Sequence, residues 1–361
     1  MKNAQLRTTA VALIGIGAAV AIIWGRTALT NSESAPPRPV TFRTQTMGTW
    51  ASLTIVTGDS AAVSDLAYRS LLALHRVDSL MSNWTDVSEV ARINRAATKE
   101  TRVQPEVARV LRFAQDVARA SDGAFDISIE PLVRLWGFIG GPPRVPTQAE
   151  ITATLERVGY DKLDFNAETR AIRFHNDGMR IDLGGIAKGY GVDQVADLLR
   201  AANASNALID LSGNMVALGN AAGRKGWTVG LRDPRGKHPF LARIRLLDEA
   251  VATSGDYEQF VAADGRRYGH ILDPRTGWSA RGLSSVTIVA RRAMVADAWA
   301  TALFVLGPEA ARRVASERDD FSAVLVEPRD EGGDVIWVEK DLRTRFEPAD
   351  ELAGKLTIRY F

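Results

Sequence analysis

The sequence predicts an α+β (mixed α/β) fold, in which one compact folded unit follows an N-terminal membrane segment. Amphipathic helical stretches are mixed with short apolar stretches between turn residues, so hairpins outnumber regular βαβ units. The chain has 361 residues, 46% hydrophobic and 24% charged, and no change of composition marks a boundary after residue 40. We therefore assign residues 1–29 to a targeting segment, 30–40 to a linker and 41–361 to one folded domain.

The cysteine count and the charge distribution exclude several functional classes. The chain has no cysteine, which rules out disulfides, thiolate zinc sites, cysteine nucleophiles and a lipid attached to an N-terminal cysteine. The net charge is +2, but residues 1–40 alone carry +3, so the remainder of the chain sums to −1. The folded part therefore offers no overall electrostatic attraction for nucleic acid.

Residues 8–25 form an uncharged stretch that follows Lys2 and Arg7. Eighteen residues in a helix rise about 27 Å, close to the hydrocarbon thickness of a bilayer. No small-x-small cleavage site follows, Arg26 ends the stretch, and Trp24 suits the membrane interface. We favour an uncleaved anchor through residues 8–24 over a cleaved signal peptide or a buried core helix. The basic start predicts an inner-membrane protein with its folded part on the periplasmic side.

Apolar periodicity and turn signals predict the elements of the folded domain in order. Asp122-Gly123 is a helix-stop signal, and Thr147 with Glu150 forms a capping box. The predicted helices are 62–79, 88–94, 104–121, 147–158, 186–202, 293–306 and 308–318. The predicted strands are 40–46, 50–56, 163–165, 171–174, 206–211, 215–218, 226–231, 241–247, 249–254, 257–262, 267–271, 283–290, and the closing pair 323–327 and 334–338.

The stretch IDLGGIAKGYGVD (residues 181–193) carries the first candidate binding residues. It passes from a strand or loop through Gly184 and Gly185 into the predicted helix 186–202. A Gly-rich bend that opens a helix presents free backbone N–H groups and the positive end of the helix dipole, which suits a pyrophosphate. Lys188 adds a positive charge, and Asp182 adds an acceptor for a polar ligand group. The alternative is a tight strand-to-helix turn with a surface lysine.

Asp297 and Thr301 are the only polar residues of the stretch 293–306. They are spaced i and i+4, so a helix places them on one face. A helix that is apolar almost all round is buried, and a buried carboxylate needs a partner or a metal. A carboxylate with a hydroxyl suits Mg²⁺, which completes its shell with water and substrate phosphates. The alternative is a structural aspartate that pairs with an arginine or caps a loop.

Two further stretches carry polar candidates. His270 begins HILDPRTG (residues 270–277) at a strand end, where it serves as an acid or base, or simply hydrogen-bonds the turn. Arg275 in the same stretch either holds a phosphate or lies on the surface. Ser254 precedes a glycine without a G-x-S-x-G elbow, so a polar turn that lines a ligand is favoured over a nucleophile.

Aromatic side chains are the last candidates. Two roles are possible for these residues: they stack on the planar ring of a ligand, or they pack in the core. The residues are Trp84, Phe125, Trp136 and Phe138.

Together these stretches resemble the ApbE family, the FAD:protein FMN transferases. The resemblance covers most of residues 41–310, in the family's order, and several motifs of this length in one order are a specific signal. The motifs are MGT (47–49), DGAFD (122–126), WGF (136–138), the stretch at 181–193, SGDY (254–257), HILDPRTG (270–277) and DAWAT (297–301).

The resemblance implies that residues 41–361 form a Mg²⁺-dependent flavin transferase domain. Such an enzyme binds FAD, transfers its FMN half to a threonine or serine of an acceptor protein, and releases AMP. By the resemblance, Asp297 and Thr301 bind the metal by side chains and Gly185 by its carbonyl, while His270 and Asp297 are the catalytic residues. The FAD site is expected to be lined by Met47, Ala124, Phe125, Asp126, Asp182, Lys188 and Ile271.

The chain departs from the family pattern in two places. Ser212 stands where the family often has glycine, and the lipobox cysteine is missing, so residues 8–24 replace the usual lipid tether. We expect the acceptor to be a membrane-associated or exported electron-transfer subunit. Two other functions stay open from sequence: an FAD pyrophosphatase that gives FMN and AMP, and a tethered flavin-binding protein without turnover.

Overall fold

The computed structural model describes residues 36–263, 265–329 and 333–361. The predicted membrane segment 1–29 and the linker up to residue 35 lie outside these described residues. Among the helices of the described part, none has both the length and the apolar character that crossing a bilayer requires.

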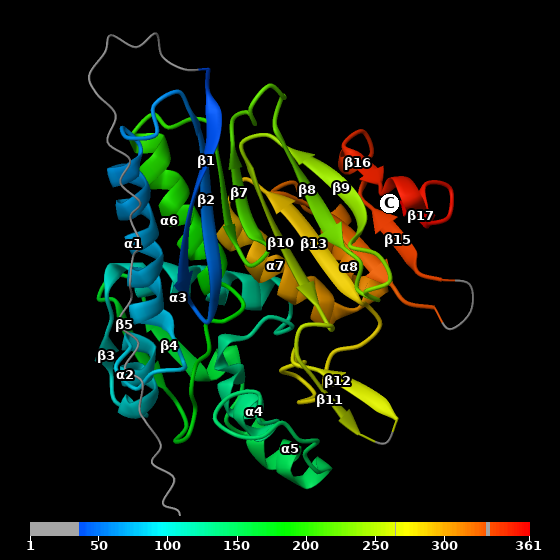
Figure 1. The fold of residues 1–361 in the computed structure, drawn as a ribbon. Coiled ribbons are helices and arrows are strands. Elements are labelled where there is room, and N and C mark those ends of the chain that lie inside the picture. Colours follow the sequence, from blue (N-terminus) through cyan, green and yellow to red (C-terminus); the bar gives the residue numbers. More distant parts are fainter. Residues whose placement is uncertain (1–35, 264, 330–332) are drawn as a thin grey trace, which may run out of the picture. The chain divides into compact units, whose positions relative to one another are not determined.

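A nine-stranded sheet forms the centre of the fold (Figure 1). Its strands run in the order β1-β2-β6-β7-β10-β13-β14-β15-β17, and β15 with β17 is the one parallel pair among them. The bounds are β1 Arg38–Thr46, β2 Thr49–Thr57, β6 Ala207–Leu211, β7 Asn214–Leu218, β10 Glu249–Gly255, β13 Ser285–Ala290, β14 Phe321–Glu327, β15 Val335–Val338 and β17 Thr357–Tyr360.

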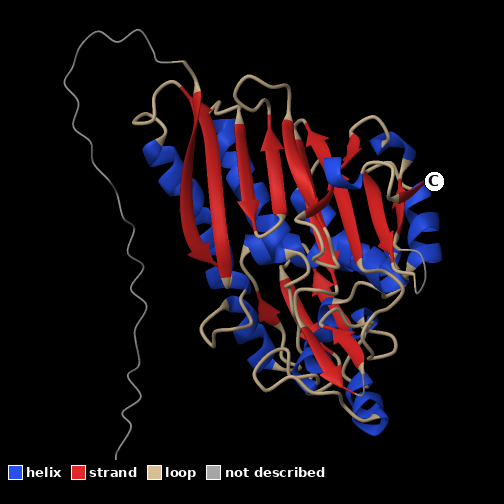
Figure 2. Ribbon diagram, turned by 45° about the vertical axis from the view of Figure 1, so that its right-hand side comes forward, coloured by secondary structure: helices blue, strands red, loops and turns tan. Residues whose placement is uncertain are grey.

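Four helices cover one face of this sheet (Figures 1 and 2). They are α1 Ser64–Met81, α6 Ala187–Ala201, α7 Ala293–Leu306 and α8 Pro308–Ser316. Ala250 and Ala252 of β10 belong to the apolar clusters under the helices, whereas Val251 between them belongs to the cluster on the other face. This period of two is what a strand buried on both faces requires.

A second, three-stranded sheet in the order β16-β9-β8 covers the opposite face. Val289 of β13 and Val324 of β14 pack there against Ile244 and Leu246 of β9. The large sheet therefore lies between a helical layer and a small sheet, and β13 is buried along its whole length. The small sheet consists of β8 Trp227–Arg232, β9 Phe240–Leu246 and β16 Phe346–Pro348.

The remaining elements gather beyond one end of the large sheet (Figure 1). A sheet of order β3-β5-β4, the hairpin β11–β12 and helices α2 to α5 make up this region. Their bounds are α2 Glu89–Ala96, β3 Thr101–Arg102, α3 Pro105–Ala120, α4 Glu130–Leu135, α5 Gln148–Leu155, β4 Leu163–Asn166, β5 Ala171–Phe174, β11 Phe260–Ala263 and β12 Arg266–Gly269. Short 3₁₀ turns lie at Ile127–Ile129, Tyr160–Lys162, Lys340–Leu342 and Asp350–Leu352.

The predicted mixture of helices and hairpins is confirmed, and residues 179–183, predicted as strand or loop, form a loop. Two corrections apply at the level of elements. β1 begins at Arg38, inside the predicted linker, because its register with β2 extends to Thr57. The fold does not close at 334–338, since β16 and β17 follow. Helix α4 was not predicted either. These three elements have three to six residues, too few for a periodic spacing of apolar residues to be visible in the sequence.

Candidate active site

One cavity of about 330 Å³ contains every residue that the sequence singled out as catalytic, metal-binding or flavin-binding. These residues come from the β1–β2 turn, the loop before the first 3₁₀ turn, the bend before α6 and the first turn of α6, the segment after β12, and α7. The predicted residues in the lining are Met47, Ala124, Phe125, Asp126, Asp182, Gly185, Lys188, His270, Ile271, Asp297 and Thr301.

The cavity floor is built on a close contact between α6 and α7. Asp297 of α7 is 6% exposed, and its Oδ2 accepts a hydrogen bond from the backbone N–H of Gly189 at 2.8 Å. A Cβ at Gly189 would lie 2.3 Å from the carbonyl oxygen of Ala293 and 2.7 Å from Cβ of Asp297. Only glycine therefore lets the first turn of α6 approach α7 closely enough for this hydrogen bond.

Asp193 fastens the same two helices from the other side. Its carboxylate accepts hydrogen bonds from the backbone N–H groups of Ala293 at 2.9 Å and Met294 at 3.0 Å. Arg292 supplies no side-chain cap to α7, so a carboxylate of α6 fills that role. Each helix thus accepts backbone N–H groups of the other through an aspartate, and their relative position is fixed.

The side chain of Thr301 and the bend at Gly185 meet next to Asp297. Thr301 Oγ1 lies 3.2 Å from Oγ of Ser254, at the end of β10. A Cβ at Gly185 would lie 3.3 Å from both Thr301 Oγ1 and a ring carbon of Phe125. The predicted metal-binding residues are therefore neighbours in space, and Ser254 binds to Thr301 instead of standing as a nucleophile.

The electrostatics of the floor favour a bound cation or proton. Burial raises the pKa of Asp297 to about 6, while the charge of Lys188 and the hydrogen bond from Gly189 act in the opposite direction. Glu258, which also lines the cavity, raises this pKa further. Asp297 has no arginine partner among the described residues, which excludes the arginine pairing weighed from sequence. The hydrogen bond that it accepts from Gly189 is the kind of backbone contact that the other structural alternative, a capping aspartate, requires.

The bend before α6 satisfies its own backbone. Asp182 Oδ1 accepts the N–H of Gly184 at 2.7 Å, and the N–H groups of Ile186 and Ala187 bond to the carbonyl of Leu183. The expectation of free N–H groups in this bend is therefore wrong for these residues and for Gly189. The N–H groups of Gly185 and Lys188 have no hydrogen-bond partner among the described residues. These two groups, the helix dipole and the ammonium group of Lys188 therefore remain for an anion.

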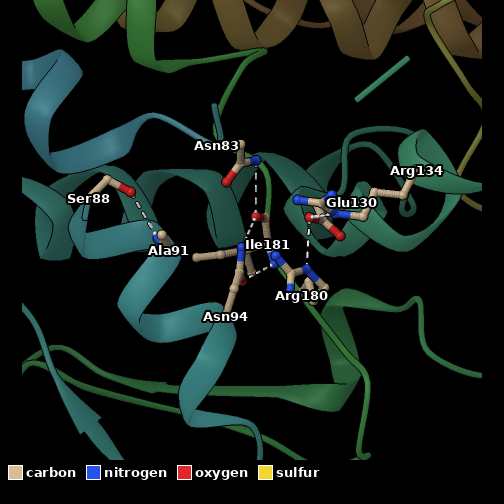
Figure 3. Close-up of polar contacts among 8 residues, drawn as sticks. All are labelled: Asn83, Ser88, Ala91, Asn94, Glu130, Arg134, Arg180 and Ile181. Atoms are coloured by element: carbon tan, nitrogen blue, oxygen red, sulfur yellow. Dashed lines mark hydrogen bonds and ion pairs between the residues drawn. The ribbon is translucent and has the colours of Figure 1, made fainter. Parts of the chain in front are cut away.

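A buried polar network holds the segment that carries Asp182 (Figure 3). Asn94 of α2 pairs with the backbone of Ile181, donating to its carbonyl at 2.9 Å and accepting its N–H at 2.7 Å. Asn83 donates to the same carbonyl at 3.3 Å. An irregular segment in a core needs such partners because its backbone has no ladder of its own.

Glu130 of α4 anchors Arg180, the residue before Ile181 in that segment (Figure 3). Its side chain is fully buried, and Oε1 accepts from Nε of Arg134 at 2.6 Å and Nε of Arg180 at 2.8 Å. These ion pairs tie α4, whose residue Val133 lines the cavity, to the wall that holds Asp182. Burial raises the pKa of Asp182, and the charge of Glu130 adds to that rise against the hydrogen bond from Gly184.

His270 faces the cavity from the segment after β12. Its Nδ1 lies 3.3 Å from the carbonyl oxygen of Gln259, which requires the proton on Nδ1 and leaves Nε2 as an acceptor. The ring packs edge-on against Phe138 with centroids 6.3 Å apart. Burial lowers the pKa of His270, opposed by the charge of Glu258, so the imidazole is held in its neutral form.

The β1–β2 turn brings Met47 to the rim. Met47 and Gly48 both have positive φ, at 50° and 72°, which is the geometry of a two-residue hairpin turn. Methionine rarely adopts this conformation, and Asp78 of α1 stabilises it by accepting the Met47 N–H at 2.8 Å. The turn is thereby fixed above α1, and Asp78 itself lines the cavity.

Ala124, Phe125 and Asp126 form the wall opposite α7. Ser121 Oγ accepts the N–H of Phe125 at 3.1 Å, and Asp126 Oδ1 accepts the N–H of Ser128 at 2.7 Å. Burial raises the pKa of Asp126 to about 6 despite this hydrogen bond. Ile271 completes the predicted set on the side of His270.

The structure separates the candidates that the sequence left open. Trp136 is fully buried, stacks on Phe138 and donates to the carbonyl of Gly277, so it belongs to the core. Arg275 pairs with Asp273 of its own turn and lies outside the cavity lining. Trp84 is 70% exposed and lines the cavity, which leaves its ring free to cover a ligand.

Some polar lining residues were not singled out from sequence, among them Asp78, Asn83, Glu258 and Gln259. Glu258 and Gln259 directly follow the SGDY stretch, and that adjacency was the available signal. Asp78 and Asn83 carry no such signal, because a polar residue in a helix or a loop is the ordinary case.

The donor set on the cavity floor fits Mg²⁺. Asp297, Thr301 and the Gly185 bend offer hard oxygen atoms, the type that Mg²⁺ prefers. Within the described residues no group of three or more His, Cys, Asp or Glu side chains is placed to hold a metal. A site with one carboxylate leaves most of the metal shell to water and substrate oxygens, as is usual for Mg²⁺ at phosphate sites.

Comparisons with known proteins bear on this geometry. The family model described as "ApbE family" matches residues 47–325. A Klebsiella pneumoniae protein named FAD:protein FMN transferase is 34% identical over 290 residues, covering 79% of this chain and 88% of its own. A Treponema pallidum protein of the same name is 35% identical over 272 residues, covering 71% and 75%.

Solved structures agree with the sequence matches. The flavin transferase ApbE from Vibrio cholerae has a TM-score of 0.79 at 29% identity, covering 86% of this chain and all of its own. The ApbE protein from Thermotoga maritima has a TM-score of 0.75 at 32% identity, covering 88% and 99%. Because the family model matches well over half of the sequence, the chain that builds this cavity belongs to the ApbE family.

Proposed function

We propose that this transferase moves the FMN half of FAD to a threonine or serine side chain of an acceptor protein and releases AMP. One observation carries the proposal: a single cavity joins the acid and hydroxyl of α7, a lysine, a neutral histidine and exposed aromatic surface. The names of the relatives support flavin transfer.

FAD has a planar ring system at one end and a pyrophosphate near its middle, and the cavity offers partners for both. Phe125, Phe138 and Trp84 provide apolar and aromatic surface for the rings. Lys188 and the N-terminal end of α6 provide positive charge for the pyrophosphate. Asp182 is the acceptor for a ligand N–H or hydroxyl.

Mg²⁺ would be held by the side chains of Asp297 and Thr301 and by the carbonyl of Gly185. When bound there, the metal neutralises charge on the pyrophosphate. Lys188 lies close enough to Asp297 to influence its pKa, so it adds charge at the same place.

His270 is the group that we assign to the acceptor proton. The hydroxyl oxygen of the acceptor forms a bond to the phosphorus of the FMN half, and the bond from that phosphorus to the bridging oxygen breaks. AMP leaves with the bridging oxygen, and the hydroxyl proton passes to Nε2 of His270. The carbonyl of Gln259 orients the ring for this step by accepting from Nδ1.

The test is incubation of the full-length chain with FAD, Mg²⁺ and a candidate acceptor, followed by intact mass measurement. We expect the acceptor to gain the mass of FMN, with loss of the gain in EDTA and recovery when Mg²⁺ is added. Free FMN and AMP without acceptor labelling would show hydrolysis instead. Full labelling in EDTA, with no metal retained by the protein, would refute the metal assignment.

Lys188→Ala and Asp182→Ala provide the test for the flavin site. Both variants are expected to bind FAD more weakly, by about tenfold or more for a lost charge-assisted contact. Lys225→Ala is the matched control for the lysine, because Lys225 lies outside the cavity lining. Unchanged FAD affinity in both site variants would show that the bend at residues 182–188 has a structural role only and does not bind FAD.

We also propose that the N-terminal segment anchors the enzyme in the inner membrane with the catalytic domain on the periplasmic side. The support is the uncharged stretch 8–25 with Lys2 and Arg7 before it. In this position the enzyme would meet acceptors that are themselves membrane-associated or exported.

A further inference from the structure

A second cleft, of about 680 Å³, lies at the C-terminal end of the large sheet. It is formed by the α7–α8 junction and α8, by β15 and β17, and by the end of β14. Figure 1 shows these elements on the side of the molecule where the chain's C-terminus lies. It shares no lining residue with the flavin cavity.

Arginine dominates the lining of this cleft. Four arginines, from α8, from the segment after β14 and from β17, face two glutamates and one tryptophan. The arginines are Arg312, Arg313, Arg329 and Arg359. Side chains of one charge that converge from three separate segments make an electropositive concavity, and such a concavity attracts anions.

The centre of the cleft is a stack on Trp337. The guanidinium of Arg312 lies 4.0 Å from the indole centroid, and that of Arg359 lies 5.3 Å from it. The indole Nε1 donates to Oε2 of Glu327 at 2.7 Å. These contacts with the indole ring hold the two guanidinium groups in place, and the exposed Arg359 keeps its N–H groups available to a ligand.

The carboxylates of the cleft do not satisfy these arginines. Arg312 Nη1 is 3.5 Å from Glu327 Oε2, too poorly placed for a hydrogen bond, and this buried nitrogen has no hydrogen-bond partner among the described residues. In the same described part, Arg313 and Arg359 form no ion pair with a carboxylate. The N–H groups that an oxyanion in the cleft can reach are those of the exposed Arg313 and Arg359, which have no carboxylate partner in the described part.

We propose that this arginine cleft binds a phosphate group. Guanidinium groups match the geometry of phosphate oxygens, two N–H groups to two oxygens, and several arginines suit a dianion better than a single carboxylate. The group belongs either to a small soluble phosphate compound or to an anionic lipid headgroup. The proposal does not depend on flavin transfer, because the two cavities are separate.

Helix α7 extends from the catalytic floor to the cleft. Leu306, the last residue of α7, lines the cleft, and Thr301 lies five residues before it on the same helix. Five residues correspond to a rise of about 7.5 Å. A ligand in the cleft therefore touches the end of the helix that carries Asp297 and Thr301.

The test uses the full-length protein with its flavin site saturated by FAD. Inorganic phosphate is titrated at constant ionic strength set with chloride, and the dissociation constant is measured by calorimetry and by the rise of the unfolding midpoint. The cleft variant is the double substitution Arg313→Gln with Arg359→Gln, at two exposed positions whose change leaves the core intact. The matched control is Arg343→Gln, an exposed arginine that stacks on Tyr360 outside the cleft lining.

We expect phosphate binding to weaken about tenfold or more in the cleft variant and to stay unchanged in the control. A second arm measures flotation with phosphatidylglycerol vesicles against phosphatidylcholine vesicles. Variant-sensitive binding to phosphate identifies a soluble ligand, and variant-sensitive binding to phosphatidylglycerol alone identifies a lipid headgroup. If the cleft variant matches the wild type in both arms, the proposal is overturned.

Discussion

At the scale of one residue, the buried carboxylate of Asp297 lowers the stability of the fold in order to provide a charge in the active site. Its carboxylate is buried against α6, and only one backbone N–H and a nearby lysine charge offset the loss of water. An amide would make the same hydrogen bond to Gly189 without the charge. A residue chosen for stability alone would therefore be asparagine, and the aspartate indicates a need for charge at this position.

Asp297→Asn is expected to abolish flavin transfer while keeping or increasing stability. In metal-free protein near neutral pH, removal of the buried charge should raise the free energy of unfolding by up to about 3 kcal/mol. The measurements are acceptor labelling and chemical unfolding in EDTA. Asp210→Asn is the matched control, since Asp210 also accepts a backbone N–H, from Gly213, but lies outside the cavity. An active Asp297→Asn enzyme would contradict the assignment.

Glu339 provides a prediction of pH dependence that does not involve the active site. Burial raises its pKa to about 7, against the hydrogen bond that its Oε2 accepts from the N–H of Ala323 at 2.9 Å. The folded protein then holds a proton that the unfolded chain releases near pH 4.5. The stability contributed by this group is therefore complete below that pH and is lost as the pH rises through about 7.

Glu339→Gln should remove this part of the pH dependence. Glutamine keeps the acceptor for Ala323 without the charge, so the variant gains stability relative to the wild type at high pH. We expect the difference in unfolding midpoint to be larger at about pH 9 than at about pH 5. Thermal unfolding at both pH values is the measurement, and an equal difference at both would show that Glu339 titrates normally.

At the scale of elements, the pair α6 and α7 is the unit that forms the catalytic floor. Asp193 and Asp297 exchange hydrogen bonds with the opposite helix, and Gly189 permits the approach. α7 carries the side-chain oxygens of Asp297 and Thr301, and the bend before α6 brings Gly185 next to Thr301. The packing between them is therefore as much part of the site as the side chains are.

Gly189→Ala tests this packing, with Gly191→Ala on the same helix as its control. The new Cβ at position 189 would lie 2.3 Å from a backbone oxygen, whereas the one at 191 would lie 3.2 Å from the flexible end of Leu74. We expect Gly189→Ala to lower the free energy of unfolding by about 1–3 kcal/mol and to lose transfer activity. Gly191→Ala should have the smaller effect on both. Equal effects in unfolding and labelling assays would mean that general helix crowding is responsible.

At the scale of the whole molecule, the layers serve to bring distant segments to one place. The β1–β2 turn at one edge of the sheet and α7 over its middle both reach the cavity, and the β11–β12 region supplies His270. The covered faces bury the apolar strands, and the cavity lies where irregular segments meet the helical layer.

The predicted anchor is testable on the whole chain. If residues 8–24 span the bilayer, the full-length protein remains in the membrane fraction after a high-salt wash, with its folded domain open to protease added on the periplasmic side. A chain that begins at residue 36 is the control and should not require detergent. Recovery of a mature soluble protein that lacks about the first 30 residues would establish a cleaved signal peptide instead.

Local sequence determined most of the helices and strands of this protein. Apolar spacing, the Asp122-Gly123 stop and the Thr147 capping box act within a few residues of the chain, so they can be interpreted without knowledge of the fold. The short helix α4 and the strands β16 and β17 were not predicted, because three to six residues are too few to show a periodic spacing of apolar residues. The motifs that resemble a known family identified the residues of the cavity, but not how they meet.

Only the tertiary structure decided which groups are partners. The hydrogen bond between Gly189 and Asp297 joins residues 108 positions apart, and the clamp of Glu130 on Arg180 joins residues 50 apart. No local pattern encodes such pairs, because each depends on where the sheet places two separate segments. The same holds for the arginine cleft, whose members look like ordinary surface charges until α8, β15 and β17 bring them around Trp337. Burial and proximity set the pKa of Asp297 and leave Nη1 of Arg312 without a hydrogen-bond acceptor among the described residues. Both are properties of that packing and not of the local sequence.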